Sequence, residues 1–483
     1  MIPTGRNKNG IVLCFVLFIG QLIHAQINAK KDFHSWSPTP PMGWNSWDCY
    51  GPNVTEAEVK ANADYMAANL KPYGWNYIVV DIRWYVANDK SHGYNETDPQ
   101  YSIDGFGRFI PAVTRFPSSA GGKGFKPLAD YLHSKGLKLG IHIMRGIPVI
   151  AVKNKMRVYG TDKTAADIFS DSVQCPWLHD MYTVLATKKG AQEYYNSIIS
   201  LYAVWGVDFI KCDDLSKPYH KTEIEMLRKA IDKCGRKIVL STSPGETPIA
   251  EGKHVQAHAN MWRTIDDFWD NWPELKAHFD IFARWNQYRT YGAYPDGDML
   301  PLGHLGIKAE RGNDRMSLFS KDEQYTVMTL WCIFKSPLMF GGDLPSNDPF
   351  TLSLLTNKEV LYILHHSINN RQVFNADNKV AWTADDPATG DKYIALFNAA
   401  DTVQTVNISV IKELDIKGNY IIKDLWTGKK GKGTTQLLSV VVNPHGTVLY
   451  KVSKCKLSAE TGQKKQSSLM AFLGKPDKYL TCL

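Results

Sequence analysis

The sequence predicts an α/β fold, a parallel (β/α)8 TIM barrel, followed by a C-terminal antiparallel β-sandwich. From Pro38 to about residue 370, short apolar runs alternate with amphipathic segments, as expected for repeated strand–helix units. From about Asn375 onward, apolar and polar residues alternate with period two, which is typical of an antiparallel sheet with one buried face. The 483 residues are enough for a large barrel and a small second domain.

Eight apolar runs are the predicted barrel strands, and the seventh is placed mainly by the segment that follows it. A capping box formed by Thr55 and Glu58 opens a helix over 55–70. Glycines at 136, 206 and 235 end helices over 125–135, 189–205 and 221–234. The predicted strands are 42–47, 77–84, 138–144, 207–212, 237–243, 257–264, 298–300 and 338–342.

The C-terminal domain is predicted from five strands separated by turn residues, over 380–383, 392–398, 403–410, 419–424 and 440–451. We therefore expect a barrel over residues 38–370 and a sandwich over 371–454. Residues 455–483 are polar and rich in lysine, and the sequence predicts no structure for them.

Residues 1–25 resemble a secretory signal, with Arg6 and Lys8 ahead of an apolar run and Ala25 at a plausible cleavage site. The sequence therefore predicts an exported protein, periplasmic or secreted. The apolar run is too short to span a bilayer, and no other stretch predicts a membrane span.

Charge and cysteine content exclude several classes of partner. The formal charge of +8 is spread along the chain, without a basic patch interleaved with aromatic residues, so no nucleic-acid partner is expected. Eight cysteines include no CxxC pair, which argues against a zinc knuckle or a thioredoxin-like motif. Cys455 and Cys482 bracket the tail and are candidates for a disulfide. The oligomeric state is not indicated.

Two acidic motifs carry most of the chemical information. Asp213-Asp214 and Asp266-Asp267 each follow an apolar run, and 54 residues separate Asp213 from Asp267, which is room for two strand–helix units. Because barrel enzymes build their sites at the carboxyl ends of strands, a pair of carboxylates there suits cleavage of a glycosidic bond. A single Asp after a strand is more often a helix or loop cap, but these acids recur at the same phase of the repeat. The 14 Trp and 23 Tyr residues fit either core packing or stacking on sugar rings.

Several motifs together resemble one enzyme family. The segments 39–47 (TPPMGWNSW), 135–141 (KGLKLGI), 210–213 (IKCD), 262–267 (WRTIDD), 296–300 (DGDML) and 336–338 (SPL) occur in the order typical of glycoside hydrolase family 27. This family contains the α-galactosidases, or melibiases, and the α-N-acetylgalactosaminidases, and the resemblance covers about residues 38–450. It implies a barrel with a C-terminal β-domain, a carbohydrate substrate, and no metal or cofactor.

The resemblance also implies roles for individual residues. Asp213 corresponds to the nucleophile of a retaining double displacement, and Asp267 corresponds to the acid/base. Physically, Lys211 beside Asp213 would keep that carboxylate ionised. The substrate-binding residues that the resemblance implies are Trp47, Asp81, His142, Cys175, Lys211, Ser243, Arg263 and Asp298.

The chain departs from the family pattern around the sugar. Ile82 replaces a second Asp, and Arg83 follows in place of a disulfide cysteine. His142 replaces a tyrosine, Ser243 replaces the Glu of galactose-specific members, and Leu215 replaces the usual disulfide partner of Cys175, which is therefore expected to be a free thiol.

Three activities compete on this evidence. The first is an exo-acting α-galactosidase. The second is a related glycosidase for N-acetylgalactosamine, favoured by Ser243, or for β-L-arabinopyranose, favoured by Ile82 because that sugar lacks the hydroxymethyl arm. The third is a non-catalytic carbohydrate-binding protein, against which the retention of Asp213 and Asp267 argues.

One further pair has metal-ligand spacing. His254 and His258 are four residues apart, but they lack the Glu of the usual zinc-binding helix and fall where a strand is predicted to begin. The sequence therefore predicts no metal site there.

Overall fold

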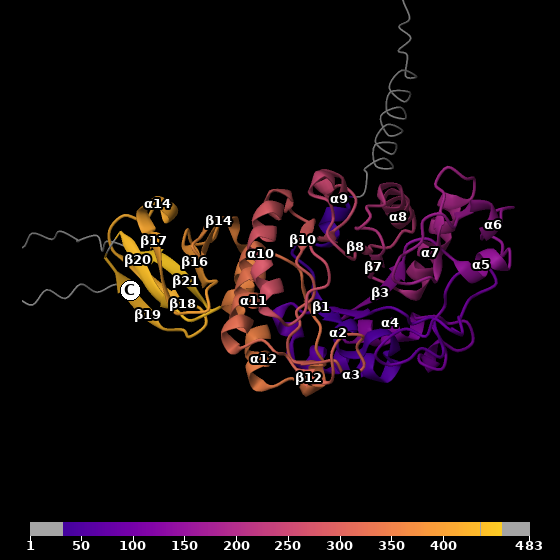
Figure 1. The fold of residues 1–483 in the computed structure, drawn as a ribbon, viewed down its shortest axis with the longest axis horizontal. Coiled ribbons are helices and arrows are strands. Elements are labelled where there is room, and N and C mark those ends of the chain that lie inside the picture. Colours follow the sequence, from indigo (N-terminus) through magenta and orange to yellow (C-terminus); the bar gives the residue numbers. More distant parts are fainter. Residues whose placement is uncertain (1–31, 435, 456–483) are drawn as a thin grey trace, which may run out of the picture.

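The computed structural model describes residues 32–434 and 436–455, so the predicted signal segment, Cys482 and residues 456–483 lie outside the described residues. A barrel and a smaller antiparallel β-domain lie side by side, with helices α10 (Trp272–Trp285) and α11 (Lys321–Phe334) between them (Figure 1). Across the described ranges, no helix combines the length and the apolar character that crossing a bilayer requires.

Eight parallel strands form the barrel sheet in the spatial order β10-β9-β8-β7-β3-β2-β1-β13. Its two edges meet where Leu300 pairs in parallel with Phe340. The Leu300 N–H donates to the Met339 carbonyl at 2.7 Å, and the Gly341 N–H donates to the Leu300 carbonyl at 3.0 Å. The predicted barrel is thus confirmed. Its strands are β1 (Met42–Asn45), β2 (Tyr77–Val80), β3 (Lys138–Met144), β7 (Phe209–Asp213), β8 (Val239–Thr242), β9 (Met261–Arg263), β10 (Tyr294–Asp296) and β13 (Leu338–Phe340).

The seventh strand differs from its prediction. The segment predicted at 298–300 is wrong, because β10 runs over Tyr294–Asp296 and Asp298 has a φ of 78°, outside the strand region. Pro295 made this run a poor strand candidate. It is tolerated because Tyr294 and Asp296 make the hydrogen bonds to β9 and its flanking residues, so the Pro295 nitrogen faces the open edge of the ladder.

Helices cover the outside of the barrel, and their ends follow the predicted signals. The Thr55 N–H donates to Glu58 Oε2 at 2.8 Å and the Glu58 N–H donates to Thr55 Oγ1, which confirms the capping box. Gly136 and Gly206 follow two of the helices with φ of 71° and 87°. Besides α10 and α11 the helices are α2 (Trp47–Tyr50), α3 (Glu56–Asn69), α4 (Lys126–Ser134), α7 (Ala191–Trp205), α8 (Lys221–Lys233), α9 (Gly252–Gln256), α12 (Pro349–Leu355) and α13 (Lys358–His366).

Two excursions extend the loops at the carboxyl end of the barrel. Between β3 and β7 a small sheet in the order β4-β6-β5 packs with two short helices. Between β10 and α11 a short hairpin carries the loop with Glu310 and Arg311. The bounds are β4 (Ile147–Pro148), α5 (Val149–Lys153), α6 (Ala165–Ile168), β5 (Phe169–Ser170), β6 (Met181–Val184), β11 (His304–Leu305) and β12 (Arg315–Met316).

The C-terminal domain is antiparallel, as predicted, with a six-stranded sheet in the order β14-β15-β16-β21-β18-β19 and a two-stranded sheet β17-β20. The run predicted as one strand over 440–451 is two strands, because the turn at Asn443–Gly446 sends the chain from one sheet to the other. Two strands of this domain, over residues 368–376 and 430–433, were not predicted. The β-domain elements are β14 (Ile368–Ala376), β15 (Lys379–Asp385), β16 (Lys392–Asn398), β17 (Gln404–Ser409), β19 (Lys430–Gly433), β18 (Tyr420–Asp424), β20 (Leu437–Val442), β21 (Thr447–Lys454) and helix α14 (Val410–Leu414).

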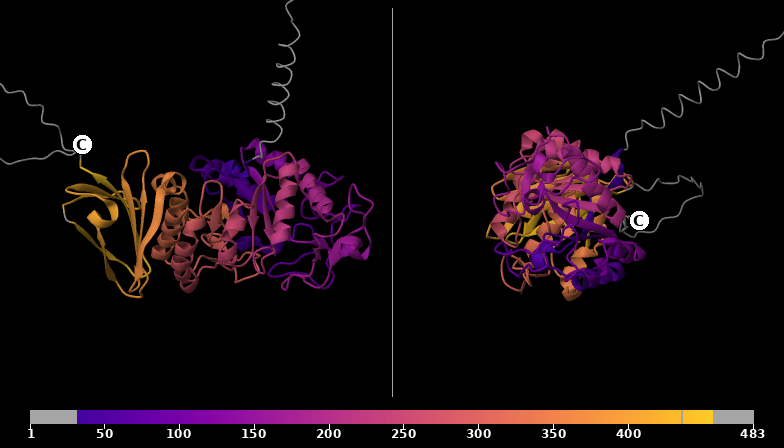
Figure 2. Two further views of the ribbon diagram at one scale, coloured as in Figure 1. Left: turned by 90° about the horizontal axis from the view of Figure 1, so that it is seen from above. Right: turned by 90° about the vertical axis from the view of Figure 1, so that its right-hand side faces the viewer.

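The hydrophobic core of the barrel extends into the β-domain, which has a second, smaller core of its own. Trp382 and Phe397 of the β-domain belong to the same buried cluster as the barrel side chains. Phe334 of α11 packs edge-on against Trp382, with ring centroids 6.0 Å apart, and Phe279 of α10 packs against Phe397 at 5.1 Å. Seen from above, the two helices again stand between the domains (Figure 2). The β-domain therefore completes the packing of two barrel helices.

Candidate active site

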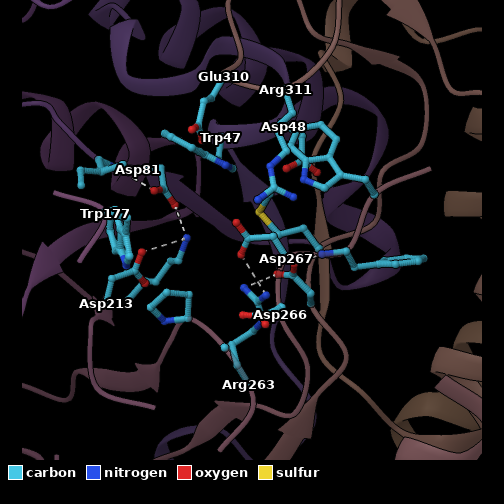
Figure 3. Close-up of a pocket in the computed structure, with 18 of the residues that line it drawn as sticks. Trp47, Asp48, Asp81, Trp177, Asp213, Arg263, Asp266, Asp267, Glu310 and Arg311 are labelled. Atoms are coloured by element: carbon cyan, nitrogen blue, oxygen red, sulfur yellow. Dashed lines mark hydrogen bonds and ion pairs between the residues drawn. The ribbon is translucent and has the colours of Figure 1, made fainter. Parts of the chain in front are cut away.

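A cavity of about 630 Å³ opens at the carboxyl end of the barrel strands (Figure 3). Eight acidic side chains, four basic ones and several aromatic rings face it, so the cavity offers both hydrogen-bonding groups and flat apolar surfaces. The residues that matter below are Trp47, Asp48, Asp81, Ile82, Tyr94, Trp177, Lys211, Asp213, Lys217, Arg263, Asp266, Asp267, Asp298, Glu310 and Arg311.

Asp213, the predicted nucleophile, is the last residue of β7 and is 5% exposed. Lys211 precedes it on the same face of the strand, and His142 lies opposite Lys211 on the neighbouring strand β3. Oδ2 of Asp213 lies 3.0 Å from His142 Nε2 and 3.8 Å from Lys211 Nζ. Burial by itself raises the pKa of Asp213, but Lys211, His142 and Arg263 together lower it below the usual value. The carboxylate is thus held as an anion.

Lys211 is shared between two carboxylates. Its Nζ lies 2.9 Å from Asp81 Oδ2, which also accepts a hydrogen bond from Asn45 Nδ2 at 2.6 Å. Burial disfavours a charged lysine, but Asp213 and Asp81 outweigh it and raise the pKa of Lys211 above its normal value. The ammonium group thus bridges Asp81 and Asp213, which are both labelled in Figure 3, and fixes their orientation.

Arg263, at the end of β9, bridges the second pair of acids. Its Nη2 donates to Asp267 Oδ1 at 3.1 Å, and its Nη1 lies 2.8 Å from Asp298 Oδ1. Burial and the nearby charge of Asp267 raise the pKa of Asp298, although Arg263 opposes this. The Asp267 side chain remains 34% exposed, so it can exchange protons with solvent in the cavity.

The two residues of each Asp pair, 213–214 and 266–267, have different surroundings. Asp214 turns away from the cavity and pairs with buried Arg145, whose Nη2 lies 2.7 Å from its Oδ2. Asp266 is 73% exposed at the rim, 3.6 Å from Lys217 Nζ. Asp213 and Asp267 therefore lie beside Lys211 and Arg263 at the strand ends, whereas Asp214 is paired behind the cavity wall and Asp266 is exposed at the rim.

Two family profiles match the chain, "Alpha galactosidase A" over residues 151–366 and "Alpha galactosidase C-terminal beta sandwich domain" over residues 376–452. A solved structure, a family 27 β-L-arabinopyranosidase of Geobacillus stearothermophilus, is 49% identical, and the match covers 90% of this chain and 100% of that one with a TM-score of 0.86. The chain belongs to glycoside hydrolase family 27.

Two further proteins are also similar to the chain. A candidate α-N-acetylgalactosaminidase of Bacillus halodurans is 47% identical, with a TM-score of 0.78 and coverage of 86% of this chain and 98% of that one. Alpha-galactosidase 2 of Arabidopsis thaliana is 27% identical over 429 residues, which are 86% of this chain and 90% of that protein. As a member of family 27, the chain is a glycoside hydrolase.

Of the substrate-binding residues expected from family 27, five line the cavity, namely Trp47, Asp81, Lys211, Arg263 and Asp298. The structure places the other three behind its wall. His142 is fully buried behind Asp213. Ser243 lines a small adjoining cavity of about 20 Å³, which shares Lys211, Arg263 and Asp298 with the main one. Cys175 is buried and takes part in no disulfide within residues 32–434 and 436–455, as expected from Leu215.

Ile82 is the departure from the family 27 pattern that reaches the cavity, where it stands beside Asp81. The Ile82–Arg83 peptide bond is cis. Arg83 points the other way and forms a buried bidentate pair with Asp180, with Nε and Nη2 at 2.7 and 2.6 Å from its oxygens. Tyr85 also donates to Asp180, at 2.8 Å. This pair stands where the family resemblance implies a disulfide cysteine.

Several cavity residues come from loops that the sequence reasoning did not single out. Tyr94 stacks on Trp47 with ring centroids 5.9 Å apart, and Trp177 follows at 6.4 Å from Tyr94. Glu310 and Arg311 reach the rim from the β11–β12 loop. These positions carry no strand-end motif, because long loops bring them to the cavity. The signal that could have found one of them is an aromatic residue in a polar loop, namely Trp177.

Proposed function

We propose that this family 27 enzyme is a retaining exo-glycosidase for terminal sugars of the α-D-galactosyl configuration, and that it prefers β-L-arabinopyranosides. β-L-Arabinopyranose has the ring hydroxyl arrangement of α-D-galactose but lacks the hydroxymethyl group. One scaffold can therefore accept both sugars, and the wall that faces the hydroxymethyl position decides between them.

Ile82 is the observation that carries the choice of sugar. Its apolar side chain lines the cavity next to Asp81, where it accepts no hydrogen bond. A galactoside that places its hydroxymethyl group there leaves a hydroxyl without a partner, at a cost of about 1–3 kcal/mol. An arabinopyranoside has no such group to satisfy. The 49% identity to the Geobacillus β-L-arabinopyranosidase supports the same assignment.

The proposed mechanism is a double displacement by Asp213 and Asp267. Asp213, kept anionic by its cationic neighbours, attacks the anomeric carbon, and Asp267 donates a proton to the departing glycosidic oxygen. In the second step a water molecule attacks the anomeric carbon while Asp267 takes its proton, and the bond from the sugar to Asp213 breaks, which gives net retention. The partial exposure of Asp267 suits this second role, because water can reach its carboxylate from the cavity.

The kinetics on three nitrophenyl glycosides test the proposal. We expect kcat/KM on the β-L-arabinopyranoside to exceed that on the α-D-galactopyranoside by roughly 5- to 150-fold, which corresponds to the free-energy cost above. Ile82→Asp should move the preference toward the galactoside, and the matched Ile82→Val variant should keep it. A faster galactoside reaction in the unmodified enzyme would overturn the choice of sugar, and no turnover of any glycoside would overturn the glycosidase assignment.

An α-N-acetylgalactosaminidase is less well supported. Ser243, which favoured it in the sequence, is 1% exposed and contacts Arg263 Nη1 at 3.5 Å instead of lining the main cavity. The N-acetyl-α-galactosaminide in the same panel checks this point, with little or no turnover expected.

We also propose that the enzyme is exported, on the strength of its N-terminal sequence alone. Fractionation of expressing cells and N-terminal sequencing of the mature protein provide the test, and a chain that begins at Met1 would contradict it.

A further inference from the structure

Three potential metal ligands come together on the outside of the barrel, away from the cavity. Glu225 belongs to α8, His254 to α9, and His258 to the turn that follows α9. Each offers one ligand atom, and these atoms all lie within 4.8 Å of one another. The predicted strand over 257–264 had argued against such a site, but β9 begins only at Met261 and the carboxylate comes from another helix, 29 residues before His254.

The hydrogen bonds of the two imidazoles leave the right nitrogen atoms for a metal. His258 Nδ1 lies 2.7 Å from the His254 carbonyl oxygen, which only accepts, so Nδ1 carries the proton and Nε2 has the lone pair. His254 Nδ1 lies 2.6 Å from the Tyr219 hydroxyl oxygen, which can accept a hydrogen bond from a protonated Nδ1 and so leave Nε2 as the ligand. Metal-binding histidines are usually oriented in this way by a carbonyl or other acceptor on the second nitrogen.

The spacing of the ligand atoms also fits a small cation. In a tetrahedral zinc site with bonds of about 2.0–2.2 Å, ligand atoms lie roughly 3.3–3.5 Å apart. His254 Nε2 and Glu225 Oε1 are 3.3 Å apart. The two imidazole rings stack with centroids 4.2 Å apart, which places the His258 ring beside that of His254 at the same point on the surface.

We propose that Glu225, His254 and His258 bind a divalent transition-metal ion, Zn²⁺ in particular, with water in the fourth position. Two imidazoles and one carboxylate suit Zn²⁺ and its neighbours in the first transition row, whereas Mg²⁺ and Ca²⁺ prefer sites built from oxygen ligands. All three side chains are partly exposed, so the ion can enter directly from solvent.

The position of the site indicates a structural role. Tyr219 lies in the β7–α8 loop, two residues after Lys217, which lines the cavity. The β8–α9 connection likewise contributes Pro244 and Gly245 to the cavity lining. A metal ion that joins α8 to α9 would clamp both connections, and it would stabilise the cavity rim without taking part in bond cleavage.

Calorimetric titration of the chelator-treated full-length enzyme with Zn²⁺ tests the site. We expect about one equivalent to bind, and Co²⁺ to give the absorption bands of a four-coordinate ion. Glu225→Gln and His258→Gln should each weaken Zn²⁺ binding by more than tenfold, and Tyr219→Phe by roughly 10- to 100-fold. The matched control is Glu251→Gln, because Glu251 is a nearby carboxylate that pairs with Lys221 at 3.5 Å and is not a proposed ligand.

Thermal unfolding gives a second, independent readout. Zn²⁺ should raise the Tm of the unmodified enzyme and of Glu251→Gln, but not of the two ligand variants. The proposal is overturned if Zn²⁺ does not bind, or if Glu225→Gln and His258→Gln bind it as tightly as the control. Either result leaves the glycosidase assignment untouched, because activity does not depend on the ion.

Discussion

Nε2 of His142 lies 3.0 Å from Oδ2 of Asp213, and both side chains are buried in the barrel wall. Because the family resemblance implies a tyrosine at position 142, this chain gives the predicted nucleophile a neighbour that can carry a positive charge. Together with Lys211 and Arg263, His142 lowers the pKa of Asp213. We therefore expect the pairing to affect the reaction and not sugar recognition.

Replacing His142 should shift the pH profile of the enzyme. In His142→Gln one of the groups that lower the pKa of Asp213 is lost, so this pKa rises. A larger fraction of Asp213 is then protonated at a given low pH. The acidic limb of the kcat/KM profile should therefore move to higher pH. His133→Gln is the control, because His133 pairs with Asp208 far from the cavity, and its profile should match the unmodified enzyme. An unchanged profile in His142→Gln would contradict the role.

Asp213→Ala should lower kcat by roughly 10⁴-fold or more, because no other group can form the covalent intermediate. Added azide should restore part of the activity and give a glycosyl azide, which chromatography and NMR can identify. Asp214→Asn is the matched variant. It should lose stability, since buried Arg145 loses one of its two carboxylate partners and keeps Glu223, but the folded fraction should keep most of its turnover. Equal kcat losses in both variants would rule out Asp213 as the nucleophile.

The acid/base role of Asp267 predicts a dependence on the leaving group. Asp267→Asn should impair natural glycosides far more than dinitrophenyl glycosides, whose leaving groups need no proton. Steady-state kinetics on a series of aryl glycosides measures this difference. Asp266→Asn should change neither substrate class by more than a few-fold, because its carboxylate is exposed at the rim. A uniform loss across the series for Asp267→Asn would require another acid.

The Arg83–Asp180 pair predicts a large effect on stability. Asp180→Asn removes the bidentate partner of the buried guanidinium and leaves it Asp89, 3.5 Å away, as a counter-charge, which should lower the free energy of unfolding by up to about 3–5 kcal/mol. Urea denaturation followed by tryptophan fluorescence measures it. Asp162→Asn removes an exposed partner of Lys163 and should leave the unfolding midpoint unchanged. Similar midpoints for the two variants would mean that the buried pair contributes little.

Most of the barrel could be predicted because each strand–helix unit repeats the same apolar pattern. The seventh strand could not be predicted, since proline is unusual within a strand and Pro295 is at its centre. Asp298 lies in a segment with a strand-like sequence, but its backbone does not have the strand conformation. In the β-domain, the turn at Asn443–Gly446 changes sheets, and period-two patterning carries no information on which sheet a strand joins.

The cavity was predictable to the same extent, and for the same reason. Asp81, Asp213 and Asp267 follow strands, and strand ends converge in a barrel, so their proximity follows from the fold. Tyr94 and Trp177 reach the cavity through loops whose paths depend on tertiary packing. The proximity of Glu225 to His254 could not be predicted either, because it depends on how α8 and α9 pack against each other.

The shared core of the two domains has a consequence for how the enzyme unfolds. Helix α10 packs against Phe397 and helix α11 against Trp382, and both helices also belong to the barrel core, so their packing depends on both domains. Cutting the chain near residue 370 would turn that second side into a solvent-exposed apolar surface, and the truncated barrel should aggregate instead of working alone. Scanning calorimetry of the whole enzyme should show a single heat-absorption peak, the behaviour of one cooperative unit with two architectures.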